Sequence, residues 1–149
     1  MSSVVDAIAA GARSESEVWA AALRGVPDWA PVFSPLAPDE LALGIETVYE
    51  AYLVHYGRPR LFEPPDADEA VLLGDYLYAH GLVRIAEAGG VAAVQVLAEL
   101  ISRCAALRAD GRHAADGAAW VAAARALGGA PDDDAVARAL EAHSARVAP

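Results

Sequence analysis

The stretch from Asp66 to Ala88, DADEAVLLGDYLYAHGLVRIAEA, constrains the fold of this chain more than any other. Its apolar residues recur at steps of three and four, which is the period of an α-helix with one buried face. The face selected by this spacing consists of Val71, Asp75, Tyr78, Leu82 and Ile85. We therefore predict a helix that packs against the body of the protein and carries a carboxylate, Asp75, inside its apolar stripe.

Two glycines in the same helix form a second stripe with a leucine, at Gly74, Leu77 and Gly81. A glycine in the middle of a helix costs about 1 kcal/mol relative to alanine. Close approach of another helix commonly offsets this cost, because a residue without Cβ leaves room for it. The glycine stripe therefore predicts a groove that admits a neighbouring helix.

Helical periodicity also dominates the rest of the chain, and no alternating pattern typical of a β-strand persists. The expected helices cover residues 4–12 and 14–25, which can join as one bent helix, then 39–56, 91–109, a segment around 120–127, and 131–143. With 149 residues we expect one domain, 1–149. The predicted fold class is all-α, a compact bundle of about six to seven helices.

Two proline-rich segments, 25–38 and 57–65, interrupt this pattern and predict extended connections. Trp29 and Phe33 are expected to anchor the first of them to the body. Asp66 with Glu69 reads as a capping box, and Gly89-Gly90 predicts a helix end. Asp132-Asp133-Asp134 is interpreted as the acidic start of the last helix.

Composition excludes several classes of function. The net charge of −10 argues against binding to nucleic acid or to an anionic membrane. The chain contains no lysine, which excludes a lysine Schiff base. Its single cysteine excludes an intrachain disulfide and fits a reducing cytoplasm. The N-terminus lacks the pattern of a signal peptide, and no apolar run reaches the ~18 residues of a membrane span.

Candidate reactive residues are sparse. The histidines at 55, 80, 113 and 143 lack metal-ligand spacing, so we expect no metal site. Cys104 lies on an apolar helix face and is interpreted as a buried hydrophobic residue. Asp75 is interpreted as a buried structural carboxylate, with His55 or a tyrosine of the preceding helix as its partner.

Tyr49, Tyr52 and Tyr56 recur at helical spacing and form an aromatic stripe. This stripe favours core packing. The alternative is that it faces a partner helix or a hydrocarbon tunnel, since a tyrosine ring can be buried while its hydroxyl finds a polar partner.

Three short sequence motifs in the chain resemble motifs of the trans-isoprenyl diphosphate synthase (polyprenyl synthetase) family. Leu53-Val54-His55 stands where that family has LVH before its first aspartate-rich motif, and Gly57-Arg58-Pro59 is similar to the following GRP turn. Leu73-Gly74-Asp75-Tyr76-Leu77 looks like the helix that opens with GDYL. The three motifs occur in the same order as in the family, and the resemblance covers about a third of the chain.

The departures from the family pattern concern its catalytic parts. Tyr56 stands where the first aspartate of the family would be, and the DDxxD segment is missing. Those carboxylates hold the magnesium ions that bridge the diphosphate leaving group. Asp132-Asp133-Asp134 lacks the context of the second aspartate-rich motif. The resemblance therefore implies a degenerate member with no catalytic residues of its own.

Some bacterial long-chain enzymes of this family pair a short all-α subunit, which lacks the aspartate motifs, with a full-length catalytic subunit. The resemblance implies that this chain is such a cytoplasmic subunit, shaped like half of an isoprenoid synthase and serving quinone side-chain synthesis. It would help set the activity and the product length of its partner, which alone would bind Mg²⁺. The residues expected at the interface or the tunnel are Tyr49, Tyr52, Tyr56, Gly74, Leu77 and Gly81.

Two other interpretations remain open. The chain can be a stand-alone or homodimeric helical protein that binds an isoprenoid or another lipid with its apolar faces. It can also be an enzyme with a divergent site built from Asp75, His80 and the acidic cluster at Asp132.

Overall fold

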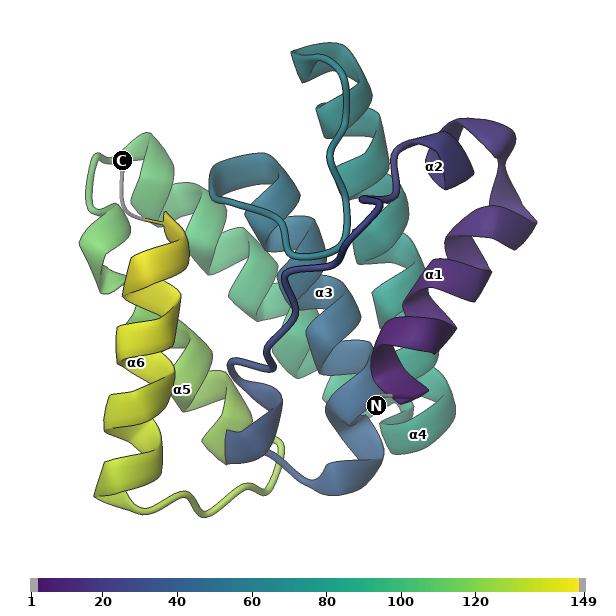
Figure 1. Ribbon diagram of the computed structural model, residues 1–149. Helices are drawn as coiled ribbons and strands as arrows, with labels where there is room; N and C mark the ends of the chain where they lie inside the picture. The colour runs from purple at the N-terminus through teal and green to yellow at the C-terminus, as the bar shows by residue number, and fades with distance from the viewer. Residues whose placement is uncertain (1–2, 148–149) are drawn as a thin grey trace.

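The computed structural model describes residues 3–147, and this part of the chain is an all-α bundle, as the periodicity predicts (Figure 1). Its α-helices are α1 (Ser3–Glu15), α2 (Glu17–Ala21), α3 (Ala42–Tyr56), α4 (Ala67–Ala109), α5 (Asp116–Ala126) and α6 (Asp133–Val147). Three short 3₁₀ helices join them: η1 (Ser34–Leu36), η2 (Asp39–Leu41) and η3 (His113–Ala115). Residues 3–147 contain no β-strand, only an isolated antiparallel bridge between Leu23 and Phe62.

Helix α3 lies at the centre of the bundle. Figure 1 shows α1 and α2 on one side of it and α5 and α6 on the other. Every residue from 44 to 54 is buried, as expected for a helix that is apolar on nearly all sides. Its most extensive helix contact is with α4. The interior of the protein is therefore organised around α3, with α4 as its main neighbour.

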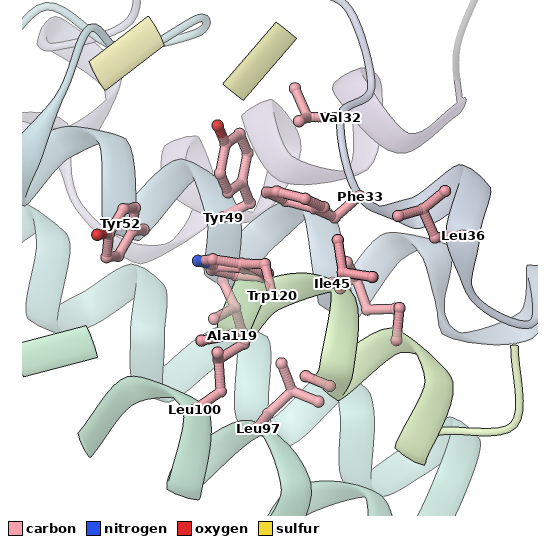
Figure 2. Close-up of a cluster of buried hydrophobic side chains, with 14 of the residues drawn as sticks. Val32, Phe33, Leu36, Ile45, Tyr49, Tyr52, Leu97, Leu100, Ala119 and Trp120 are labelled. Atoms are coloured by element: carbon pink, nitrogen blue, oxygen red, sulfur yellow. The ribbon is translucent and has the colours of Figure 1, made fainter. Parts of the chain in front are cut away.

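The core consists of two groups of side chains on opposite sides of α3. The larger group joins α3 to the second half of α4, to α5 and to α6, and Figure 2 shows part of it. At its centre the Trp120 ring stacks on Phe33 at 5.2 Å between centroids and meets Tyr49 edge to face, also at 5.2 Å. The smaller group joins α3 to α1, α2 and the first half of α4, around Ile8, Phe62 and Leu73.

Helix α4 begins and bends where the sequence predicts. The Asp66 side chain accepts a hydrogen bond from the Glu69 amide at 2.8 Å, which caps the helix. Gly90 has φ 73° and ψ −168°, a backbone conformation that favours glycine. The helical geometry is interrupted by a kink at this residue, where the Gly89-Gly90 pair predicts a helix end, and a second helical segment then continues to Ala109.

The two proline-rich connections run side by side and are tied together through their backbones. The Asp28 amide donates to the Arg60 carbonyl at 2.8 Å. Just before the first connection, the Ala22 carbonyl at the end of α2 accepts from the Glu63 amide at 2.7 Å. The predicted anchors of the first connection are confirmed, because Phe33 is 1% exposed and the Trp29 ring lies 4.0 Å from the Arg60 guanidinium carbon.

The last helix starts at the acidic cluster, as predicted. The Asp132 side chain accepts a hydrogen bond from the Ala135 amide at 2.8 Å, so this residue caps α6. At its other end α6 docks on the second proline-rich connection, where the Arg58 amide donates to the Arg146 carbonyl at 3.0 Å. The interpretation of the aspartates as a helix start is therefore confirmed.

The predicted buried face of the first half of α4 is wrong at Val71 and Asp75 and right at Ile85, which is 0% exposed. Val71 is 52% exposed, and the Asp75 side chain is 68% exposed. The residues that this segment buries are Leu73, Gly74, Leu77, Gly81 and Ile85. The reason is that the glycine stripe, not the stripe of larger side chains, lets α3 approach closely, and this rotates Val71 and Asp75 outward.

Candidate functional site

A buried arginine, Arg60, joins the second proline-rich connection to α3. Its side chain is completely buried, with Nη1 2.6 Å from Glu46 Oε1 and Nε 3.0 Å from Glu50 Oε1. The two glutamates are four residues apart on α3 and therefore lie on one face of the helix. We call Arg60, Glu46 and Glu50 the arginine clamp.

The carboxylates of the clamp also bind the backbone of both proline-rich connections. Glu46 Oε2 accepts hydrogen bonds from the Val32 and Ser34 amides, and Glu50 Oε2 accepts from the Arg60 and Leu61 amides. Three of these donors lie in irregular backbone, and the fourth, Ser34, is the first residue of η1, whose amide has no partner within that helix. The clamp thus replaces regular secondary structure as the partner of the connections.

The electrostatics of the clamp fit a structural role. Burial alone would lower the pKa of Arg60, but the carboxylates of Glu46 and Glu50 offset it and hold that pKa above its ordinary value. The Trp29 ring covers the guanidinium with a cation–π contact. Because both glutamates are at most 1% exposed, the clamp presents no group to a substrate.

A second buried cluster connects α3, α5 and α6 through His143. Its Nδ1 lies 2.7 Å from the Tyr49 hydroxyl, and its Nε2 lies 2.8 Å from Asp116 Oδ1. An ionised carboxylate only accepts hydrogen bonds. We therefore assign the His143 proton to Nε2, so that Nδ1 accepts from Tyr49.

Tyr52 and Arg108 complete this cluster at its outer edge. The Tyr52 hydroxyl donates to Asp116 Oδ2 and accepts from Arg108 Nε at 3.1 Å, while Arg108 Nη2 lies 3.1 Å from the same carboxylate oxygen. Burial alone would raise the pKa of Asp116. The hydrogen bonds from His143 and Tyr52 and the nearby Arg108 charge outweigh this effect and hold the pKa below its ordinary value.

The order carboxylate, imidazole, hydroxyl is the one that enzymes use to activate a nucleophile. Here the hydroxyl belongs to Tyr49, which is 0% exposed, and burial raises its pKa far above the ordinary value. A nucleophile must reach a substrate, and this one is sealed by Phe33 and Trp120. The His143 cluster therefore ties three helices together and is not an accessible reactive site.

The predicted glycine groove exists, but it is filled from within the chain. A Cβ added to Gly74 would lie 2.4 Å from His55 Nε2, and one added to Gly81 would lie 2.7 Å from Val48 Cγ2. Both neighbours belong to α3. The expected close helix contact is thus confirmed, and the helix that fills the groove is α3 of the same chain.

Gly81→Leu should therefore destabilise the fold itself. The new side chain would collide with the Val48 side chain and come close to its backbone nitrogen, where a Cβ alone would already lie at 3.1 Å. Overpacking of this kind costs about 1–3 kcal/mol or more. Urea denaturation should show this loss, and Ala79→Leu, an exposed position on the same helix, should leave the stability nearly unchanged. Equal midpoints for the two variants would contradict the placement of Gly81.

The predicted burial of Asp75 is wrong. Its side chain is 68% exposed, so it is not a buried carboxylate. The predicted partner is right, because His55 Nε2 lies 3.4 Å from Asp75 Oδ1. The His55 side chain is the more buried of the two, and its ring stacks on Tyr78 at 5.2 Å. Burial lowers the pKa of His55, and the nearby Asp75 charge partly opposes this shift.

The tyrosine stripe divides between core and surface. Tyr49 and Tyr52 are 0% and 1% exposed, so the core-packing interpretation is confirmed for them. Side chains of α5 and α6, among them Trp120 and His143, pack against both rings. Tyr56 is half-buried, 4.9 Å from the Tyr52 ring and 4.7 Å from the Arg108 guanidinium carbon. Of the six predicted interface residues, Tyr56 keeps part of its side chain at the surface.

The residues of the predicted divergent enzyme site are not brought together. Asp75 and His80 are five positions apart on one helix, which places them about 140° apart around its axis. His80 contacts the Tyr76 ring at 5.4 Å, whereas Asp132 caps α6. Cys104 is 1% exposed, and burial raises its pKa to about 11, which confirms it as a buried hydrophobic residue.

The side of α4 that faces away from α3 exposes several apolar side chains. Val71, Leu72 and Val83 are 52%, 61% and 55% exposed, and Ala79 and Ala86 are also exposed. We call these five residues the outer face of α4; the exposed Asp75 lies among them, one helical turn from Val71 and from Ala79. By length and composition α4 is also apolar enough to cross a membrane, and only 28% of its most apolar 18-residue window is buried, although Gly90 interrupts its helical geometry.

Sequence reasoning did not find the charged residues that hold the fold together. These are Glu46, Glu50, Arg60, Asp116 and His143, all at most 3% exposed. Two glutamates four residues apart inside an otherwise apolar helix were a usable signal for a buried cation. Nothing near Arg60 in sequence identifies it as that cation, because the contact depends on the path of a proline-rich connection.

Comparison with known proteins identifies no relative. No family model matches the chain, and neither a curated protein nor a solved structure matches it significantly. Within residues 3–147, no group of three or more His, Cys, Asp or Glu side chains is arranged to hold a metal ion.

Proposed function

We propose that this chain is a noncatalytic helical subunit that binds a catalytic polyprenyl diphosphate synthase subunit through the outer face of α4. The observation that supports this proposal is the exposed apolar surface of Val71, Leu72 and Val83 on the longest helix. An apolar patch on one side of a stable bundle is typical of a surface that meets a partner. The polar clusters inside the bundle are saturated by their own chain and offer no competing site.

Energetics favour a partner that covers the whole patch. Burying the exposed half of a valine or leucine side chain contributes roughly 1 kcal/mol. Three such residues alone do not hold a complex together, because association also costs translational and rotational freedom. The interface would therefore extend past the outer face onto neighbouring parts of α4, reaching the area of about 800 Å² on each partner that is typical of specific complexes.

The choice of a polyprenyl diphosphate synthase as the partner rests on the three short motifs that resemble that family. In this chain they lie at the junction of α3 and α4, where His55 packs against Gly74 and the Gly57 turn follows the end of α3. The subunit would support the active form of its partner in the cytoplasm and influence product chain length. Mg²⁺ and the diphosphate chemistry would belong to the partner.

A second candidate function is a stand-alone or homodimeric protein that binds an isoprenoid or another lipid. The observation that favours it is the high apolar content of α4, of which only a minor part is buried. This candidate uses the same helix but needs no synthase.

Sedimentation velocity can test the proposal with the full-length synthase, carrying both aspartate-rich motifs, from the same genome. The wild-type chain should form a complex with it. Val83→Glu should weaken that complex at least tenfold, because a charge in an apolar contact loses about 1.4 kcal/mol or more. Val26→Glu is the matched control, since Val26 is also exposed, at 82%, but lies in a connection.

The outcomes separate the candidates. Failure of the wild-type chain to bind the synthase, or equal binding by Val83→Glu and Val26→Glu, would refute the proposal. Binding of a fluorescent farnesol analogue by the chain alone, with loss in Val83→Glu, would favour the second candidate.

A further inference from the structure

A groove lies between the short helix α2 and the beginning of α4. Its volume is about 430 Å³. Three apolar side chains line it: Val18 and Trp19 from α2, and Leu72 from α4. Val18 and Leu72 are 49% and 61% exposed, so the groove presents an apolar surface that this chain does not cover.

The apolar floor of the groove is held in place. The Trp19 ring stacks on Tyr76 of α4 with 5.9 Å between centroids and 26° between planes. In the same helix as Trp19, the Ser16 hydroxyl accepts a hydrogen bond from the Val18 amide and caps α2. A preorganised floor reduces the ordering cost of binding.

Negative charge surrounds this floor. Asp66, Asp68 and Glu69 line the groove, and no arginine is among its lining residues. Asp68 and Glu69 make no ion pair within the described part of the chain, so their charges remain available. The combination of an apolar floor and an acidic rim defines the chemistry of the occupant.

We propose that this groove binds a basic amphipathic helix of a partner protein. Apolar side chains of that helix would contact Val18, Trp19 and Leu72, while its lysines or arginines would pair with Asp68 and Glu69. A second copy of this chain fits poorly, because each copy carries a net charge of −10 and would bring like charge to the rim.

The groove is continuous with the outer face of α4 through Leu72, which belongs to both. The inference thus rests on the proposed function in assuming a protein partner, and it specifies the kind of segment that this partner would contribute. Its test uses a peptide and no synthase, so that the two proposals can fail separately.

The probe is a fluorescein-labelled, 14-residue peptide in which leucines form one helical face and lysines the other. Fluorescence anisotropy at low ionic strength should show saturable binding to the full chain. Val18→Ser should weaken binding several-fold, whereas Val26→Ser should not. A peptide with glutamate in place of lysine should not bind measurably, because the rim would repel it.

The charge of the rim has a matched control within the chain. Asp68 and Glu69 lie in the first turn of α4 after the cap Asp66, and Asp133 and Asp134 lie in the first turn of α6 after the cap Asp132. D68N/E69Q should weaken peptide binding about three- to tenfold at low salt. D133N/D134N removes the same charge from the same type of position and should change binding less than about twofold.

The following results would contradict the proposal that this groove binds a basic amphipathic helix. Equal weakening by D68N/E69Q and D133N/D134N would show that the overall negative field, not the rim, attracts the peptide. Tight binding of the glutamate peptide would remove the role of charge. Val18-dependent self-association of the chain, or Val18-dependent binding to phosphatidylcholine vesicles, would assign the apolar floor to another occupant. Circular dichroism of every variant should match the wild type, since all substituted side chains are partly or fully exposed.

Discussion

Arg60→Met should lower the free energy of unfolding by about 3–5 kcal/mol, the cost of breaking a buried ion pair on one side. The substitution leaves Glu46 and Glu50 buried and negative without their cation. It also removes the link between α3 and the proline-rich connection at Trp29. A loss of this size is a large fraction of the stability of a typical domain.

Urea denaturation followed by circular dichroism measures this loss. Arg103→Ala is the control, because Arg103 is exposed on α4 and should change stability by less than about 0.5 kcal/mol. The triple variant R60M/E46Q/E50Q should be more stable than R60M, since it removes the uncompensated charges. If R60M is as stable as R103A, the clamp does not hold the connections.

Asp116→Ala has the second-largest expected effect, a loss of about 3–5 kcal/mol. Without this carboxylate, the donors of His143 and Tyr52 lose their acceptor inside the core, and Arg108 loses its ion pair. Asp110→Ala is the control, because Asp110 is exposed at the end of α4. Thermal and urea unfolding should separate the two variants clearly.

The pH dependence of this loss identifies its electrostatic origin. The pKa of Asp116 in the folded protein lies below its ordinary value of 3.8, so the unfolded chain binds the proton first as pH falls. Asp116 therefore stabilises the fold fully above that value, and this contribution disappears as pH falls through the folded-state pKa. The stability difference between wild type and Asp116→Ala should shrink in strongly acidic solution. A constant difference would mean that packing, not charge, causes the loss.

Local signals in the sequence were sufficient for the fold class, for the starts of α4 and α6 and for the interruption of α4, but not for α2, which covers Glu17–Ala21 and not 14–25. The caps at Asp66 and Asp132 and the break at Gly90 each depend on residues within one or two turns. Such features follow from backbone hydrogen bonding and from the conformational freedom of glycine. They are therefore predictable without knowledge of the tertiary structure.

The orientation of α4 was not predictable in the same way. Two adjacent stripes, one containing Asp75 and one containing Gly74, both had helical spacing. Which of them became buried was decided by α3, whose His55 and Val48 occupy the space that the glycines leave. Periodicity measures the hydrophobicity of a face, whereas burial also depends on how closely another helix can approach.

The buried charged residues could not be predicted from the sequence either, because their partners are distant along the chain. Glu46 and Arg60 are fourteen residues apart, and Asp116 and His143 are twenty-seven apart. Their contacts depend on the complete arrangement of the chain. These residues stabilise the interior, so no motif of an exposed catalytic site marks them in the sequence.

We propose that this chain acts on a synthase and not on a substrate of its own. The most direct measurement is product formation from an allylic diphosphate and isopentenyl diphosphate with Mg²⁺, for the chain alone, the full-length synthase alone, and both together. We predict no turnover by the chain alone, and a change in the rate or product length of the synthase that Val83→Glu abolishes and Val26→Glu preserves. Turnover by the isolated chain, or a synthase whose rate and product length are identical with and without it, would contradict this proposal.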